Sequence, residues 1–223
     1  MVIAIDGPAG AGKSTVAGKL AKKLGILHLD TGAMYRAAVL YALDRGCDPA
    51  DGATADRLAA EIDVTVQSSP DGQRTFLNGR DVSAIMREHR VSKAASDFSA
   101  HSSVRLKMAA LQRQIAVRVD IILDGRDIGT FVLPDADFKF FLTADIEERA
   151  RRRTLELKEK GRDVQFADVL REMEERDRND SSRALAPLKK AEDAIAVDTT
   201  RNTADEIVER LAAYIKGKLK TEN

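Results

Sequence analysis

A glycine-rich segment directly after a short apolar run constrains the fold of this chain more than any other feature. The run Val2–Ile5 has the length of a buried strand, and the next residues fill every fixed position of the pattern glycine, four residues, glycine, lysine, serine or threonine, with Gly7, Gly12, Lys13 and Ser14. Glycines allow positive backbone dihedrals, so that consecutive amides can wrap a phosphate at the positive end of the following helix. The segment therefore predicts a strand, a phosphate-binding loop and a helix, in that order.

The residues after the loop agree with this prediction. Val16, Leu20 and Leu24 fall on one face of a helix, and Gly25 stands where a C-cap glycine belongs. Lys13 supplies a mobile charge for the outer phosphates of a nucleotide, and the Ser14 hydroxyl suits Mg²⁺, a hard ion with oxygen ligands. We expect the nucleotide to be held by the whole loop, which comprises Gly7, Pro8, Ala9, Gly10, Ala11, Gly12, Lys13, Ser14 and Thr15.

Short apolar strands alternate with amphipathic helices through most of the 223 residues. Alternation of this kind is typical of a parallel sheet with helices on both faces. The length fits one α/β domain of the P-loop NTPase class with small insertions. The five predicted strands are Val2–Ile5, Leu27–Leu29, Ile121–Leu123, Phe138–Leu142 and Ala194–Val197.

The stretch from Ile62 to Val82 breaks the alternation. It contains two apolar runs around a Ser-Ser-Pro-Asp-Gly turn, and then Asn78-Gly79, which is a strong signal for a two-residue hairpin. The pattern predicts a small antiparallel β insert.

The C-terminal stretch from Ala204 to Lys220 reads as one amphipathic helix. Its apolar residues Ile207, Leu211, Tyr214 and Ile215 recur at helical spacing, so we expect all four to face the core.

A charge-dense helix is predicted between Asp145 and Gly161. Such a helix is usually a solvated face, but a basic helix on a phosphate-binding scaffold also suits a lid that closes over a triphosphate. Arg149 and Arg153 stand four residues apart and so share one face. Both interpretations remain open for this pair.

Composition excludes several classes of protein. Lysine plus arginine equal aspartate plus glutamate at 36 each, and there is no tryptophan, which argues against nucleic acid or an anionic membrane as a partner. Cys47 is the single cysteine, so an internal disulfide and a cysteine-based zinc site are excluded. The three histidines, His28, His89 and His101, lack metal-ligand spacing. We expect a soluble, cytoplasmic protein.

The residues that follow later strands distinguish among phosphate-loop proteins. Asp124 closes an apolar strand, where a carboxylate can hold Mg²⁺ or its waters beside Ser14. The base-pocket and switch motifs of regulatory GTPases are absent. Arginines instead cluster beside acidic and hydroxyl residues in Asp30–Arg36, Asp124–Gly129 and Glu175–Arg183. Arginine forks bind phosphate, so a second, phosphorylated substrate is indicated, and its ionised phosphate needs no general base.

Taken together, these motifs resemble those of the bacterial cytidylate kinases, and the resemblance runs nearly end to end. It implies a nucleoside monophosphate kinase fold, ATP with Mg²⁺ as donor and CMP or dCMP as acceptor. It also implies a core (1–61, 93–145 and 166–223), a monophosphate-binding lobe (62–92) and a lid (146–165). The segments that carry it are Gly7–Thr15, Leu29–Arg36, Asp124–Thr130, Glu159–Gly161, Arg176–Arg183 and Ala186–Leu188.

The resemblance also implies roles for individual side chains. Asp127, Arg105 and Ser96 match the positions that recognise the base, and an aspartate there suits the amino group of cytosine but not the carbonyl of uracil. Arg36 and Arg126 match acceptor-phosphate ligands. The group that resembles the one serving the ribose and the reacting phosphates is Arg176, Asp180 and Arg183. With the phosphate-loop lysine and the lid candidate Arg153 added, we expect the catalytic charges to be Lys13, Arg126, Arg153, Arg176 and Arg183.

Two further positions belong to the acceptor side. Thr31 retains a hydroxyl where many relatives carry serine, so we expect it to contact the substrate as serine does. Asp30 either helps to hold Mg²⁺ or caps the helix that follows, and the sequence favours neither role.

Three other functions remain open at this stage. A kinase of the same architecture could act on UMP, AMP or a small metabolite, an ATP-dependent protein could act on nucleic acid, and a regulator could bind ATP without catalysis. No surface pattern demands a partner, so we expect a monomer.

Overall fold

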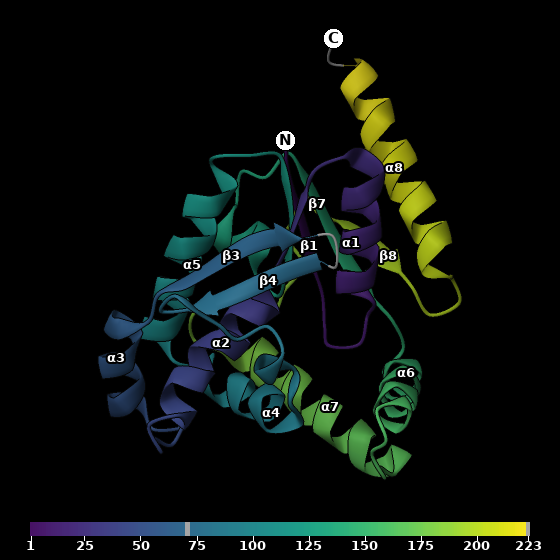
Figure 1. Ribbon diagram of the computed structural model, residues 1–223. Helices are drawn as coiled ribbons and strands as arrows, with labels where there is room; N and C mark the ends of the chain where they lie inside the picture. The colour runs from purple at the N-terminus through teal and green to yellow at the C-terminus, as the bar shows by residue number, and fades with distance from the viewer. Residues whose placement is uncertain (70–71, 222–223) are drawn as a thin grey trace.

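Five parallel strands form the central sheet, as predicted, and the structure places them in the order β2-β6-β1-β7-β8 (Figure 1). The computed structural model describes residues 1–69 and 72–221. Four of the strands extend past their predicted ends by one or two residues, and β8 both begins and ends one residue later. Their bounds are β1 (Val2–Asp6), β2 (Leu27–Asp30), β6 (Ile121–Gly125), β7 (Phe138–Thr143) and β8 (Ile195–Asp198).

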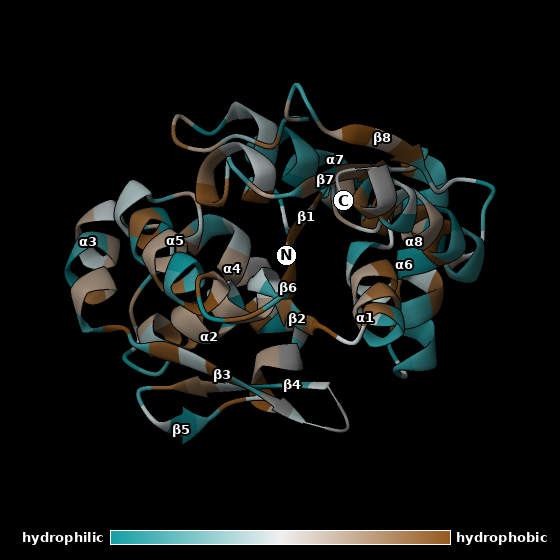
Figure 2. Ribbon diagram, turned by 90° about the horizontal axis from the view of Figure 1, so that it is seen from above, coloured by the Kyte–Doolittle hydropathy of each residue, from teal (hydrophilic) through white to brown (hydrophobic). Residues whose placement is uncertain are grey.

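Side chains that alternate along β1 separate the two faces of the sheet. Ile3 and Ile5 pack into one hydrophobic cluster, whereas Ala4 packs into the other. The first cluster lies under α1 (Lys13–Leu24) and α8 (Ala204–Thr221), and the second lies under α2 (Thr31–Leu43) and α5 (Ser102–Ala116). Outside them, α3 (Gly52–Glu61) packs on α5, and α4 (His89–Phe98) packs on α2. Figure 2 shows the two groups of helices on either side of the apolar strands.

The first helix follows its predicted signals. It begins after Gly12 and ends at Gly25, and both glycines have left-handed backbone conformations, with φ of 82° and 71°. Val16 and Leu20 on its inner face are buried. The loop glycines and the C-cap therefore decide where α1 starts and stops.

The prediction for α8 is wrong at one position. Ile207, Leu211 and Ile215 are buried, but Tyr214 keeps 39% of its surface exposed. Its ring lies nearly perpendicular to the rings of Phe138 and Phe140, with centroids 6.4 and 6.0 Å away. The hydroxyl of a tyrosine favours a partly exposed position, where one side of the ring is apolar and the other reaches water.

The predicted insert forms a separate antiparallel sheet of β3 (Val64–Ser69), β4 (Gly72–Leu77) and β5 (Arg80–Asp81). Asn78 and Gly79 form the tight turn between β4 and β5, with φ of 46° and 81°, as the hairpin signal predicted. The predicted Ser-Ser-Pro-Asp-Gly turn lies partly outside the described residues. Val64 and Leu77 are buried in the cluster that includes α2, so the insert packs on the body of the protein.

The charged segment folds into α6 (Ile146–Glu159), followed by α7 (Phe166–Ser182), and the two helices pack against each other at the lower end of the view in Figure 1. A small cluster of Ala150, Leu157, Val169 and Met173 joins them. Two short turns complete the architecture, η1 (Ile85–Arg87) and η2 (Ile128–Val132). None of the helices that the structure describes is long and apolar enough to cross a membrane.

Candidate active site

The loop after β1 has the backbone that the glycine pattern predicts. Gly7, Gly10 and Gly12 have φ of 145°, 75° and 82°. A Cβ at Gly7 would lie 1.9 Å from the carbonyl oxygen of Leu142, a backbone atom that cannot move aside. Glycine is therefore required at Gly7 by close approach to β7 as well as by conformation.

Lys13 is buried at the centre of this loop. Its Nζ donates a hydrogen bond to the carbonyl oxygen of Pro8 at 2.7 Å. Burial, and then the neighbouring charge of Arg126, lower the pKa of the Lys13 amine well below its usual value. No ion pair joins Lys13 to a carboxylate among residues 1–69 and 72–221, so a phosphate placed in the loop would supply a close anionic partner.

Ser14 and Asp124 meet at the ends of β1 and β6, which are paired in the sheet. The Ser14 hydroxyl donates to Asp124 Oδ2 at 2.6 Å. Burial opposes ionisation of the Asp124 carboxyl, but the hydrogen bond from His28 and the charge of Lys13 outweigh it, so that its pKa lies below the usual range. An ionised carboxylate beside a hydroxyl fits Mg²⁺, which takes oxygen ligands and keeps several waters.

Asp180 gathers two of the predicted arginines. It is 1% exposed, and its Oδ2 accepts from Arg126 Nε at 2.8 Å while Oδ1 pairs with Arg183. Burial opposes ionisation of Asp180, but the charges of Arg126 and Arg183 outweigh it and hold its pKa below the usual value. The carboxylate thus fixes two guanidinium groups at one place.

Arg176 is the cation of this group with the least compensation. Its Nε is buried and has no hydrogen-bond partner among the described residues. Burial, and then the charge of Arg126, lower the pKa of Arg176 to about 10, and Arg36 and Arg183 contribute to the same effect. Four arginines therefore crowd one region, and an anionic ligand would relieve their repulsion.

Asp30 caps the N-terminus of α2, which is one of the two roles that the sequence left open for it. Its Oδ1 accepts from the amide of Ala33 at 3.0 Å, which is a helix cap, and its Oδ2 pairs with Arg36 at 2.9 Å. Thr31 is buried, and its hydroxyl donates to the carbonyl oxygen of Asp124 at 2.7 Å. In this structure both residues serve the frame of the site.

Arg105 and Asp127 form a buried pair beyond the arginine cluster. Arg105 Nη2 lies 2.6 Å from Asp127 Oδ2, yet neither atom makes an aligned hydrogen bond to a described residue. The ring of Tyr35 lies 5.6 Å from the guanidinium, and the carbonyl oxygen of Ser99 accepts from Nη1 at 3.2 Å. Ser96 is half-buried on α4, and its carbonyl oxygen accepts from the Ser99 hydroxyl. The pair thus keeps polar capacity for a further group.

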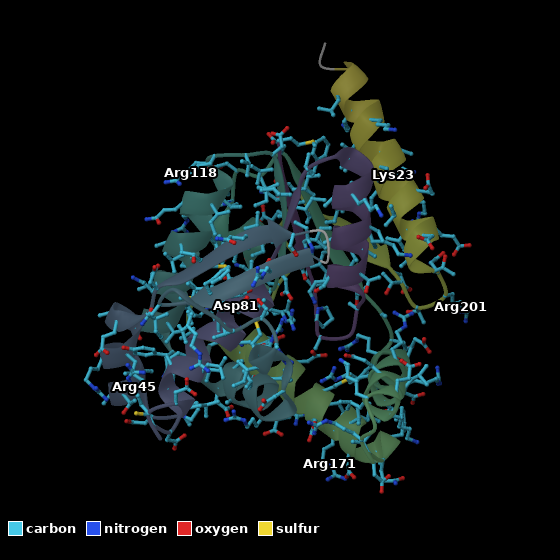
Figure 3. The ribbon with its side chains drawn as sticks, viewed as in Figure 1. Lys23, Arg45, Asp81, Arg118, Arg171 and Arg201 are labelled. Atoms are coloured by element: carbon cyan, nitrogen blue, oxygen red, sulfur yellow. The ribbon has the colours of Figure 1, made fainter. Side chains whose placement is uncertain are left out.

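The two arginines of the predicted lid occupy different surroundings. Arg149 is buried against the phosphate-binding loop, donating to the carbonyl oxygens of Ala9 and Ala144 at 3.0 and 2.9 Å and pairing with Asp177 at 2.7 Å. Arg153 is partly exposed and pairs with Glu156 on its own helix. The structure brings Arg149 to the loop and leaves Arg153 away from it. Arg171 and Arg201 project outward from the surface (Figure 3).

Several supporting residues were missed at the sequence level. Asp6 accepts from the amides of Ile128 and Gly129, both at 2.8 Å, and so holds the turn after Asp127. Gln73 of β4 accepts from the Asp30 amide at 2.9 Å, which ties the insert to α2. The Ser99 hydroxyl accepts from Arg183 at 3.0 Å. Asp6 stands directly before the glycine pattern, and that position was a usable signal.

A phosphate-binding loop on the first strand of a parallel sheet, facing clustered arginines across the strand ends, defines a P-loop kinase. A family model described as cytidylate kinase matches residues 3–217. The chain belongs to the cytidylate kinase family, whose members are nucleoside monophosphate kinases.

Individual relatives agree over nearly the whole chain. A cytidylate kinase of Shouchella clausii is 50% identical over 214 residues, covering 96% of this chain and 95% of the relative. One of Caldanaerobacter subterraneus is 50% identical over 220 residues, covering 99% and 96%. Among solved structures, an uncharacterized protein from Eubacterium ventriosum shares the fold, with a TM-score of 0.50 at 15% identity and coverage of 97% and 98%.

Proposed function

We propose that this kinase transfers the γ-phosphoryl group of ATP to CMP or dCMP, giving ADP and CDP or dCDP. The observation that carries the proposal is the buried Arg105–Asp127 pair next to the arginines around Asp180. The base of the acceptor can bind at the Arg105–Asp127 pair, and its phosphate can bind at the arginines around Asp180. The phosphate-binding loop then supplies the donor site on the other side of the strand ends.

On the donor side, the loop from Gly7 to Thr15 would hold the ATP phosphates with its amides, and Lys13 would contact the outer ones. Ser14 and Asp124 would hold Mg²⁺ or its waters. Bound there, Mg²⁺ would neutralise developing charge on the phosphates. Arg149 already lies against the loop, where it would support the nucleotide.

On the acceptor side, Arg36, Arg126, Arg176 and Arg183 would bind the monophosphate and stabilise charge during transfer. The acceptor phosphate is ionised at neutral pH, so these residues need only orient it and neutralise it. Asp180 holds two of the arginines in place and would also face the ribose.

Base selection follows from Asp127, with Arg105 and Ser96 as its partners. The exocyclic amino group of cytosine can donate to the Asp127 carboxylate, whereas the carbonyl of uracil would face that carboxylate unpaired. Mismatches of this kind support discrimination of about 10⁴-fold. Thr31 would act from the helix start, through the frame that it shares with Asp124.

Residues 62–92 and 146–165 would move as a monophosphate-binding lobe and a lid, between the core segments 1–61, 93–145 and 166–223. In that motion Arg153 would exchange Glu156 for the nucleotide. We also infer a cytoplasmic monomer that binds neither nucleic acid nor membrane, since its charges balance at 36 of each sign.

A steady-state assay with CMP, dCMP, UMP, dUMP and AMP tests the proposal. We expect CMP and dCMP to be the preferred acceptors, and Asp127→Ala to abolish most of the preference over UMP. Asp135→Ala, which changes an exposed aspartate near the same turn, is the matched control and should keep the wild-type ratio. Equal use of UMP and CMP, with a ratio unchanged by Asp127→Ala, would contradict the base assignment.

The same preparation separates the other candidate functions. ATP hydrolysis stimulated by single-stranded nucleic acid at physiological salt would favour a nucleic-acid-dependent ATPase. Binding of ATP without ADP formation from any monophosphate would favour a regulator.

A further inference from the structure

His28 lies in β2, which β6 separates from β1 and its phosphate-binding loop. In the parallel register, His28 is paired with Ile122 and Asp30 is paired with Asp124. Residues two apart on a strand share a face, so His28 and Asp124 are diagonal neighbours on one side of the sheet. Their side chains meet there, with His28 Nε2 2.7 Å from Asp124 Oδ1.

The two oxygens of Asp124 are therefore held from opposite sides. Oδ2 accepts from the Ser14 hydroxyl at 2.6 Å, and Oδ1 faces the imidazole of His28. An ionised carboxylate only accepts hydrogen bonds, so His28 Nε2 must be the donor. Asp124 is 3% exposed, which leaves water little access to replace either partner.

The surroundings of the ring also fix its position. A Cβ built on Gly18 of α1 would lie 3.5 Å from His28 Nδ1, so the ring packs along the first helix. The imidazole, whose side chain is 22% exposed, thus lies against α1 and β6 with its Nε2 facing the carboxylate.

We propose that His28 is a positioning residue that orients Asp124 toward the magnesium side of the phosphate-binding loop. The proposal rests on the function proposed for Asp124 and adds a residue that touches neither nucleotide nor metal. Partners of this kind orient the groups around a metal, and their loss typically costs 10-fold to 100-fold in metal affinity.

Binding of Mn²⁺ to the protein with saturating ADP, followed by electron paramagnetic resonance, tests this directly. His28→Leu keeps an apolar side chain against α1 but removes the donor, and we expect at least 10-fold weaker Mn²⁺ binding. His28→Gln keeps an N–H group at similar reach and should recover affinity to within about threefold of wild type. His101→Gln is the matched control, because His101 contacts the carbonyl of Pro49 outside the site, and it should bind Mn²⁺ normally.

Kinetics supply a second readout. We expect His28→Leu to lower kcat and raise the Mg²⁺ concentration needed for half-maximal rate, with the KM for CMP within about twofold of wild type. If His28→Leu does not fold, His28→Gln and His28→Asn make the same comparison, since the shorter asparagine cannot reach Asp124.

Wild-type Mn²⁺ affinity in His28→Leu would overturn the proposal, and so would equal losses in the leucine and glutamine variants, which would assign the ring a packing role. Asp124→Asn separates this result from the underlying function. Unchanged Mn²⁺ affinity in Asp124→Asn would refute the magnesium role of Asp124 itself, whatever His28 does.

Discussion

Arg105 and Asp127 lie 2.6 Å apart in the interior, 1% and 4% exposed, yet their facing atoms make no aligned hydrogen bond to a described residue. A buried charge pair depends on both members, because either alone is left uncompensated in a region of low polarity. The fold therefore depends on both charges of the pair, while their facing atoms can still bind a further polar group. Stability and base selection measure these two properties separately.

Arg105→Met should lower the free energy of unfolding by about 3–5 kcal/mol, because it leaves the Asp127 carboxylate buried without its cation. The double variant Arg105→Met/Asp127→Asn should be more stable than Arg105→Met alone, since the uncompensated charge is removed. Urea denaturation followed by circular dichroism measures both. A double variant that loses the sum of the two single effects would show that the pair is not coupled.

Arg176→Met should make the protein more stable and less active. Burial and the neighbouring Arg126 lower the pKa of Arg176 to about 10, which means that folding disfavours its charge. We expect the free energy of unfolding to rise by about 1 kcal/mol. Activity should fall at least 100-fold, because a phosphate ligand is lost.

The matched control for this change is Arg171→Met on the same helix. Arg171 is 73% exposed, points outward in Figure 3 and pairs only loosely with Asp168, at 3.3 Å. Its replacement should change stability by less than about 0.5 kcal/mol and leave the rate unchanged. Equal effects of the two substitutions would argue against electrostatic crowding at Arg176.

Replacement by alanine should stabilise the protein at Gly18 but weaken nucleotide binding at Gly7. At Gly18 the new Cβ would make only an ordinary contact, 3.5 Å from His28, so helix propensity should stabilise α1 by about 0.5–1 kcal/mol. At Gly7 the Cβ would collide with the Leu142 carbonyl. We expect Gly7→Ala to bind an ATP analogue more than 10-fold more weakly, measured by calorimetry beside urea denaturation, and normal binding would refute the close-approach argument.

The free energy of unfolding should depend on pH through the carboxyl group of Asp6. Burial raises the pKa of its carboxyl from 3.8 to about 7, although the amides of Gly129 and Ile128 oppose the shift. Between these values the folded protein binds more protons at Asp6 than the unfolded chain does. The stability that Asp6 contributes is therefore present near pH 4 and is lost as the pH rises through 7.

The comparison with Asp6→Asn isolates this effect. We expect the free energy of unfolding of wild type minus that of the variant to decrease with rising pH, by at most about 1.4 kcal/mol per unit between pH 4 and 7. Urea denaturation at half-unit intervals measures it. A difference that does not vary with pH would place the pKa of Asp6 near its ordinary value.

Local patterns were sufficient for the five strands of the central sheet, for the Asn78-Gly79 turn and for the phosphate-binding loop. The glycine pattern at Gly7–Thr15, the Asn78-Gly79 turn and the five apolar runs each depend on residues that are close in sequence, and the structure shows them all. Such signals follow from backbone conformation and from periodicity, which neighbouring residues alone decide.

The partners of the charged side chains were decided only by the tertiary structure. Arg149 lies under Ala9, 140 residues away in sequence, although its pattern also fitted a solvated helix face. His28 meets Asp124 across 96 residues because β2 lies beside β6, and no periodicity records which strands become neighbours. Asp30 caps α2, and Tyr214 reaches water. The sequence by itself determined where the strands of the central sheet, the Asn78-Gly79 turn and the phosphate-binding loop form. Strand order and side-chain packing decided which charged side chains meet, because those contacts join segments that no local pattern connects.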